Sequence, residues 1–105
     1  MAKYVFAYHG VSGGPASKEE MKKVMDAWGA WFGSMGSAVI DAGNPVGKSS
    51  TVKADGSLAS GGGANPLSGY SLIECASLDD AHKKAKGCPI LKSGGSIEIA
   101  QAMDM

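Results

Sequence analysis

Two helix-start signatures, each lying between β-rich runs, constrain the fold of this chain more than any other feature. The first runs from Ser17 to Glu20 and reads S-K-E-E. Its serine can accept a hydrogen bond from the amide three residues on, while the glutamate reaches back. The second, from Ser77 to Asp80, reads S-L-D-D and is a variant of the same pattern. We therefore predict helices that begin directly after Ser17 and Ser77.

The first of these helices is expected to end at Gly36 and to bury one apolar stripe. The spacing of its apolar residues is i, i+3, i+4, i+7, at Met21, Val24, Met25, Trp28, Trp31, Phe32 and Met35. Gly29 and Gly33 lie inside the helix, where each costs about 1 kcal/mol relative to alanine. This cost indicates a close approach, either by another part of the chain or by a ligand.

The β-rich runs complete a β-α-β-β-α-β order, which is the ferredoxin-like pattern. They cover residues 3–9, 37–43, 70–76 and 96–102, with a short extension of the second run through S-S-T-V-K-A. We predict one α+β domain over residues 1–105, with a four-stranded antiparallel sheet in the order 4-1-3-2 and two helices on one face. The glycine-rich segment from Asp55 to Gly69 is expected to be a loop.

The first strand carries apolar residues on both faces, so both faces of the sheet are expected to be covered. Tyr4 and Tyr8 lie on one face, and Val5 and Ala7 lie on the other. The helices can cover only one of these faces. We therefore expect a homodimer in which two sheets pack through their open faces.

Charge and composition exclude several classes of function. Ten basic and ten acidic residues give a formal net charge of zero, so nucleic acid is not an expected partner. No apolar run is long enough to cross a membrane, and the N-terminus does not resemble a signal peptide, so we expect a cytoplasmic protein. Cys75 and Cys88 are expected to be free, buried thiols. No metal-ligand spacing or cofactor motif is present, so neither a metal nor a cofactor is expected.

The segment G-N-P-V-G-K-S resembles a phosphate-binding loop but does not fit its spacing. Ala42 stands where the first glycine of G-x-x-x-x-G-K-[ST] should lie, and Gly43 comes one residue too late. The residues that follow are β-branched and interrupted by glycine, whereas the motif needs a helix there. This loop is therefore not expected to bind a nucleotide.

Most of the glycines fall in loops that the predicted topology brings to one end of the sheet. Such loops either hold a small polar ligand through their backbone amides or are simply flexible. Trp28 and Trp31 are either core residues or the aromatic wall of a pocket beneath these loops. Asn44, Lys48 and Asn65 are the expected polar contacts of a ligand, because two Asn-Pro turns border the same end.

His9 is the candidate acid or base, because it ends the first strand at the glycine-rich end. Tyr70 and Asp41 are its candidate partners, and a His that is merely hydrogen-bonded is the alternative. Glu74 and Glu98 stand inside otherwise apolar strands. Those two strands are not adjacent in the 4-1-3-2 order, so the two glutamates are not expected to pair.

Beyond these patterns, the chain resembles the YCII-related family. The resemblance is carried by K-Y-V-F-A-Y-H-G at the start, by the first helix and second strand, and by G-Y-x-L-I-E, S-L-D-x-A and K-G-C-P in the second half. It implies a small bacterial domain whose ferredoxin-like protomers form a dimeric α+β barrel. Some relatives resemble lyases of chlorinated aromatic diols, with a catalytic His on the first helix and Asp at the end of the first strand. Trp28 and His9-Gly10 occupy those places here.

Taken together, these features predict a domain that binds a small polar or aromatic molecule under the glycine-rich loops. Acid or base chemistry at His9 is one version of this prediction. A non-catalytic dimeric module for ligand sensing, or an accessory domain, is the alternative.

Overall fold

The computed structural model of the chain describes residues 1–10, 17–61, 66–92 and 94–103. Its strands are β1 (Ala2–His9), β2 (Val39–Asp41), β3 (Ser50–Val52), β4 (Leu58–Ser60), β5 (Leu67–Cys75) and β6 (Ser96–Ala102). Its α-helices are α1 (Lys18–Met35) and α2 (Leu78–Ala85), and short 3-10 helices are η1 (Gly36–Ala38) and η2 (Pro89–Leu91). Within these residues, no helix is long and apolar enough to cross a membrane.

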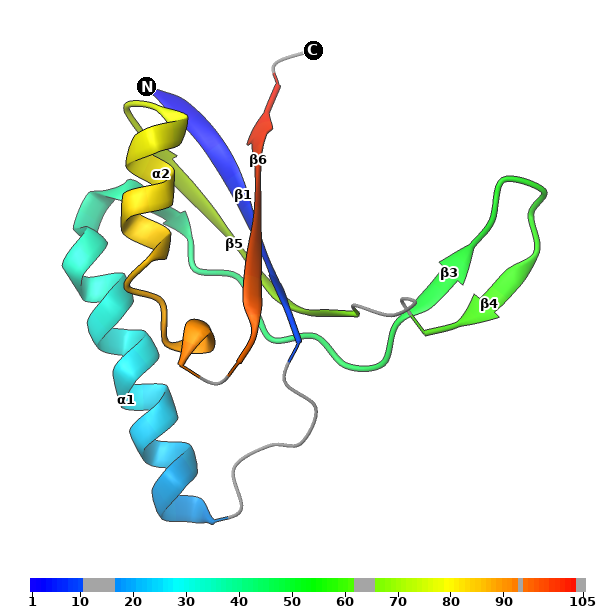
Figure 1. Cartoon of the computed structure of the whole chain (residues 1–105), viewed down its shortest axis with the longest axis horizontal. Coiled ribbons are helices and arrows are strands. Elements are labelled where there is room, and N and C mark those ends of the chain that lie inside the picture. Colours follow the sequence, from blue (N-terminus) through cyan, green and yellow to red (C-terminus); the bar gives the residue numbers. More distant parts are fainter. Residues whose placement is uncertain (11–16, 62–65, 93, 104–105) are drawn as a thin grey trace.

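Four of the described strands form the antiparallel sheet that the sequence predicts. Its four strands lie in the order β2-β5-β1-β6, which is the expected 4-1-3-2 order. Both α-helices lie on one side of this sheet, and the other side is open (Figure 1). The α+β fold with a ferredoxin-like arrangement is therefore confirmed.

Both helices begin where their capping residues predict. Ser17 Oγ accepts a hydrogen bond from the Glu20 amide at 3.1 Å, and Ser77 Oγ accepts one from the Asp80 amide at 3.1 Å. Gly36 ends α1 with a φ of +55°, a conformation that residues with a side chain rarely adopt. Local chemistry thus accounts for both ends of α1.

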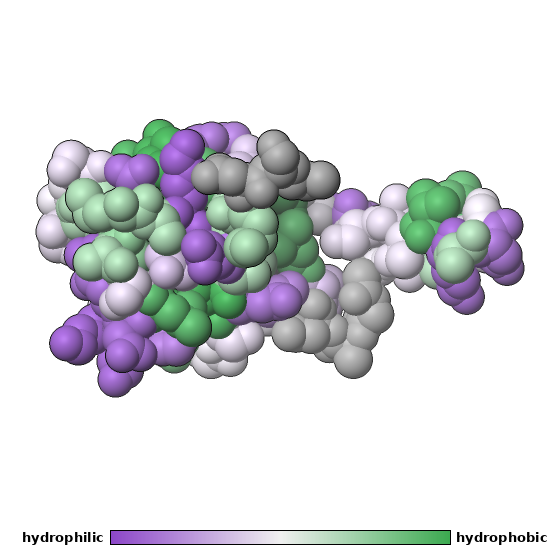
Figure 2. Space-filling view, turned by 90° about the horizontal axis from the view of Figure 1, so that it is seen from above, coloured by the Kyte–Doolittle hydropathy of each residue, from purple (hydrophilic) through white to green (hydrophobic). Residues whose placement is uncertain are grey.

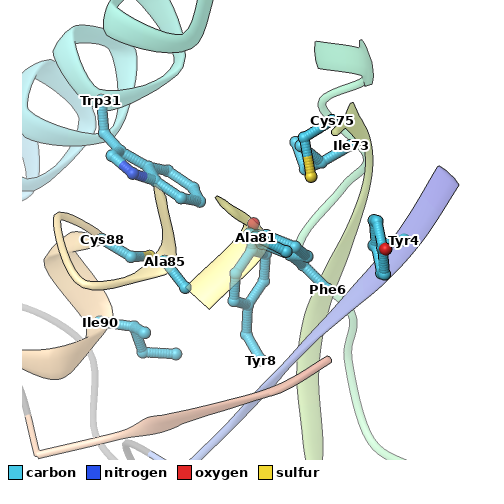
Figure 3. Close-up of a cluster of buried hydrophobic side chains, with 10 residues drawn as sticks. All are labelled: Tyr4, Phe6, Tyr8, Trp31, Ile73, Cys75, Ala81, Ala85, Cys88 and Ile90. Atoms are coloured by element: carbon cyan, nitrogen blue, oxygen red, sulfur yellow. The ribbon is translucent and has the colours of Figure 1, made fainter. Parts of the chain in front are cut away.

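The core lies between the helices and one face of the sheet, where Trp31 of α1 points toward the aromatic residues of β1 (Figure 3). Trp31 stacks against Phe6 with ring centroids 6.3 Å apart, and its indole Nε1 donates to the Lys84 carbonyl at 2.9 Å. The members of the core are Tyr4, Phe6, Tyr8, Trp31, Ile73, Cys75, Ala81, Ala85, Cys88 and Ile90. Cys75 and Cys88 are free and buried, as predicted.

The prediction of a loop from Asp55 to Gly69 is wrong in part. Leu58–Ser60 forms β4, which pairs with β3 in a separate two-stranded sheet, and β5 already begins at Leu67. The turn between β3 and β4 is held by Asp55, whose Oδ1 accepts from the Ser57 amide at 2.9 Å and from its hydroxyl at 2.6 Å. These hydrogen bonds lower the pKa of Asp55. The hairpin projects away from the main body (Figures 1 and 2).

The apolar stripe of α1 is buried only in its second half, which also differs from the prediction. Trp31 is buried and Phe32 is partly buried, whereas Met21, Val24 and Met25 are exposed. The first turns of α1 extend past the end of the sheet (Figure 1), so these side chains have no strand beneath them. Val24 and Met25 lie instead at a cavity, which the next subsection describes.

Candidate functional site

One wall of the cavity is formed by a face of α1. Its residues are spaced at three and four positions, so they follow one side of the helix. They are Val24, Met25, Trp28, Gly29 and Phe32. Trp28 is the centre of this wall, since it contacts Phe32 at 5.9 Å and meets the Tyr8 ring edge-on at 4.9 Å between centroids. The wall therefore continues directly from the aromatic core.

The opposite wall is formed by the loop after β2, which lies against the start of β5. The Tyr70 amide donates to the Asn44 carbonyl at 3.3 Å, and the Val46 amide donates to the Ser68 carbonyl at 3.1 Å. Gly43 makes this close approach possible. A Cβ at Gly43 would lie 1.8 Å from the Tyr70 carbonyl oxygen, and the φ of Gly43 is +73°. A residue with a side chain would push the loop away from β5.

Between these walls lies a cavity of about 620 Å³, which we call the α1 cavity. Its described lining consists of Tyr8, Val24, Met25, Trp28, Gly29, Phe32, Ala42, Gly43, Asn44, Pro45, Ser68, Gly69, Tyr70 and Ile90. None of these residues carries a charge at neutral pH, and most of them are apolar or aromatic. The volume is within the range of about 300–1,000 Å³ that is usual for small-molecule sites.

Besides Ser68, whose hydroxyl donates to the Tyr8 carbonyl at 3.0 Å, polar groups are found at two places around the α1 cavity. At its inner side, the buried Tyr8 hydroxyl donates to Ser71 Oγ at 2.7 Å, and Ser71 donates to the Ala42 carbonyl at 2.7 Å. Burial raises the pKa of Tyr8 well above its usual value, so this phenol stays neutral. In the wall opposite α1, Asn44 Nδ2 donates to the Tyr70 hydroxyl at 3.2 Å. Both places offer hydrogen bonds but no charge.

The predicted ligand-binding residues fall into three groups. Trp28 and Asn44 line the α1 cavity. Trp31 belongs to the core, and Lys48 is exposed and is not among the lining residues. Asn65 lies outside the described residues.

The structure does not bring the three predicted catalytic residues together. His9 Nε2 lies 3.0 Å from Glu98 Oε1, on the open face of the sheet. Asp41 Oδ1 accepts from the Gly43 amide at 2.8 Å and so holds the loop after β2. Tyr70 contacts Asn44 in the wall opposite α1. Since β5 lies between β1 and β2, His9 and Asp41 are on strands that are not neighbours.

Sequence reasoning missed the contact between His9 and Glu98, although the predicted strand order contained it. In the order 4-1-3-2 the last strand is the neighbour of the first. The observed register pairs Ala7 with Glu98 and His9 with Ser96, which places His9 and Glu98 diagonally on one face. The position of the last strand beside the first is therefore the signal in the sequence that indicates this pair.

The cavity-lining role of Gly29 and Phe32 was also missed. Phe32 was expected in the apolar stripe, and Gly29 was noted as costly inside a helix. A Cβ built on Gly29 meets no described atom within 4 Å, so the expected alternative of a tight contact with another part of the chain is wrong. The glycine inside the helix was the signal in the sequence. In the structure it lies beside the open space of the α1 cavity.

The two buried cysteines are not reactive nucleophiles at neutral pH. Burial raises the pKa of Cys88 to about 11 and also raises that of Cys75, so both thiols are protonated at neutral pH. Within the part of the chain that the structure describes, no group of three or more His, Cys, Asp or Glu is placed to hold a metal ion.

A scan against protein-family models finds no match for this chain, and a search of curated proteins finds none either. The α1 cavity and the contact between His9 and Glu98 are the observations on which a function can be argued. Of these two, only the cavity carries information about a ligand.

Proposed function

We propose that this protein binds a small, uncharged, ring-bearing molecule in the α1 cavity. The observation that carries the proposal is a cavity of about 620 Å³ with an aromatic wall and no charged residue in its described lining. A charged ligand would lose its hydration there without gaining an ionic partner, which is costly. A flat ring, in contrast, can stack on Trp28 and displace water from apolar surface.

The wall opposite α1 supports a ligand with one polar substituent. The Tyr70 hydroxyl accepts from Asn44, and its own O–H remains suited to donate. The side-chain carbonyl of Asn44 is a further acceptor. A hydroxyl or carbonyl group on the ring is the substituent that these groups would orient.

The test uses two probes of similar shape and different charge, 2-naphthol and 2-naphthoate. At pH 7 the phenol is neutral and the carboxylate is charged. In isothermal titration we expect 2-naphthol to bind at one site per chain and 2-naphthoate to bind at least about tenfold more weakly. No saturable binding of either probe, or equal binding of both, would contradict the proposal.

The contact between His9 and Glu98 favours a second candidate, which is acid or base chemistry on the open face. A carboxylate 3.0 Å from an imidazole can hold the ring in a fixed orientation. This pair lies outside the α1 cavity lining. We therefore expect His9→Ala to leave 2-naphthol binding unchanged, and a tenfold loss would instead show that the two places act together.

We further propose that two copies pair through the open face of the sheet. The register places Leu72 and Ala100 on either side of Val5 on this face, and Val5 is 39% exposed. The cross-strand neighbours Lys3 and Glu74 border this apolar centre. Membership of the YCII-related family, with its dimeric barrel and bacterial origin, stays a prediction.

A further inference from the structure

We infer that Gly29 determines the size of the ligand that the α1 cavity accepts, an inference that rests on the proposed function. Gly29 lies on the α1 wall, within one turn of Met25, Trp28 and Phe32. Any side chain at this position would enter the space that the ligand is proposed to fill. Gly29 would therefore act by being small, without a specific contact of its own.

The backbone of α1 does not require glycine at this position. Gly29 lies inside the helix and is not among the glycines with a positive φ. A glycine inside a helix is destabilising relative to alanine, so alanine would favour the fold at this point. Helix formation alone therefore gives no reason for Gly29.

Packing of the chain does not require glycine at this position either. An ideal Cβ on Gly29 meets no described atom within 4 Å. At Gly43, in contrast, a Cβ would clash with the Tyr70 backbone, so Gly43 is needed for the fold. The space beside Gly29 is part of the α1 cavity, and keeping that space open is what glycine achieves.

Gly33 provides a matched control in the same helix. It also has no positive φ, and a Cβ on it also meets no described atom within 4 Å. Unlike Gly29, however, it is not part of the cavity lining, and nothing in the structure accounts for it. Substitutions at the two positions should thus have equal effects on the helix and different effects on the ligand.

The experiment compares Gly29→Ala and Gly29→Leu with Gly33→Ala and Gly33→Leu in the full chain. Alanine at either position should raise Tm by about 5 °C, because it favours the helix. For the two-ring probe 2-naphthol, we expect Gly29→Leu to weaken binding at least about tenfold, with Gly29→Ala in between. The binding of phenol, which has one ring, should weaken less in the Gly29→Leu protein. Both Gly33 variants should bind 2-naphthol within about twofold of the wild type.

Two results would overturn the inference while leaving the proposed function intact. One is a Gly29→Leu protein that binds 2-naphthol as well as the wild type does. The other is an equal loss of binding in the Gly33→Leu protein. If the wild type binds neither 2-naphthol nor phenol, the proposed function itself fails, and the inference fails with it. Circular dichroism and the Tm of each variant show whether it is folded.

Discussion

Ser71 joins three segments of the chain through its hydroxyl group. It accepts from the Tyr8 hydroxyl of β1 and donates to the Ala42 carbonyl of the loop after β2, while it lies itself in β5. Ser71 is 1% exposed, so water cannot replace these partners. These two hydrogen bonds therefore connect the loop that forms one wall of the α1 cavity to β1 and β5.

Removing the Ser71 hydroxyl should destabilise the protein more than the loss of one small group would by itself. We expect Ser71→Ala to lower the free energy of unfolding by about 1–3 kcal/mol, because the Tyr8 hydroxyl is then left buried without its acceptor. Tyr8→Phe should cost about 1 kcal/mol. The double variant should cost less than the two together, since no unpaired hydroxyl remains. Urea denaturation measures all three, and strictly additive costs would contradict this account.

At the residue scale, the sequence could name the aromatic stripe of α1 but could not divide it between core and cavity. Trp28 and Trp31 are three positions apart on one helix, so periodicity treats them alike. What separates them is where the sheet ends and where the loop after β2 lies. The role of Asp41 could not be predicted either, because its hydrogen bond with the Gly43 amide depends on the conformation of the loop after β2.

At the element scale, the β3–β4 hairpin is the part of the fold that differs most from the prediction. Each of its strands has only three residues, which is too short for an alternating pattern to stand out. Val52 and Leu58 face each other across the pair and are 68% and 75% exposed. An isolated two-stranded hairpin is marginally stable in water, so β3 and β4 should open more easily than the main sheet.

Amide hydrogen exchange checks this expectation. The hydrogen-bonded amides of the β3–β4 pair should exchange at least about a hundredfold faster than those shared by β1 and β5, because local opening is sufficient to expose them. The amides of Phe6 and Ile73 in the main sheet serve as the reference. Protection of Thr51 or Ala59 equal to that of Phe6 would show that the hairpin is held by contacts absent from this account.

The longer elements were predictable because several local signals agreed. Both α-helices have a capping serine, and the strand at Ser96–Ala102 alternates between exposed and partly buried residues from Ser96 to Ala100. The second strand was expected over residues 37–43 and is limited to Val39–Asp41, because Gly36–Ala38 continue from α1 as a 3-10 helix. Short elements that follow a helix end are thus harder to place than long periodic ones.

At the scale of the whole molecule, the open face of the sheet supports pairing of two copies. We expect light scattering during gel filtration to give the mass of two chains at micromolar concentration. Val5→Glu should give a folded monomer, because it places a charge in the apolar centre of that face. Thr51→Glu on the hairpin is the control and should stay dimeric. A wild-type protein that is folded and monomeric at this concentration would contradict the proposal.

The sequence predicts a pocket beside the first helix but neither its volume nor its full lining, because these depend on two segments that are far apart along the chain. Sequence reasoning named Trp28 and Asn44 as ligand contacts, and both line the cavity. Its walls come from the aromatic stripe of α1 and from the loop after β2, and its lining is mainly apolar. Glycines shape the cavity at two positions. Gly43 allows the loop after β2 to approach the backbone of Tyr70, and Gly29 leaves open space beside α1.

The central claim is that this cavity is the ligand site, and NMR titration of the isotope-labelled wild type with 2-naphthol tests it most directly. The account predicts saturable shifts of the Gly29, Asn44 and Gly69 amides and of the Trp28 indole, with the amides of α2 unchanged. The absence of saturable shifts, or shifts centred on His9 and Glu98 on the open face, would contradict it.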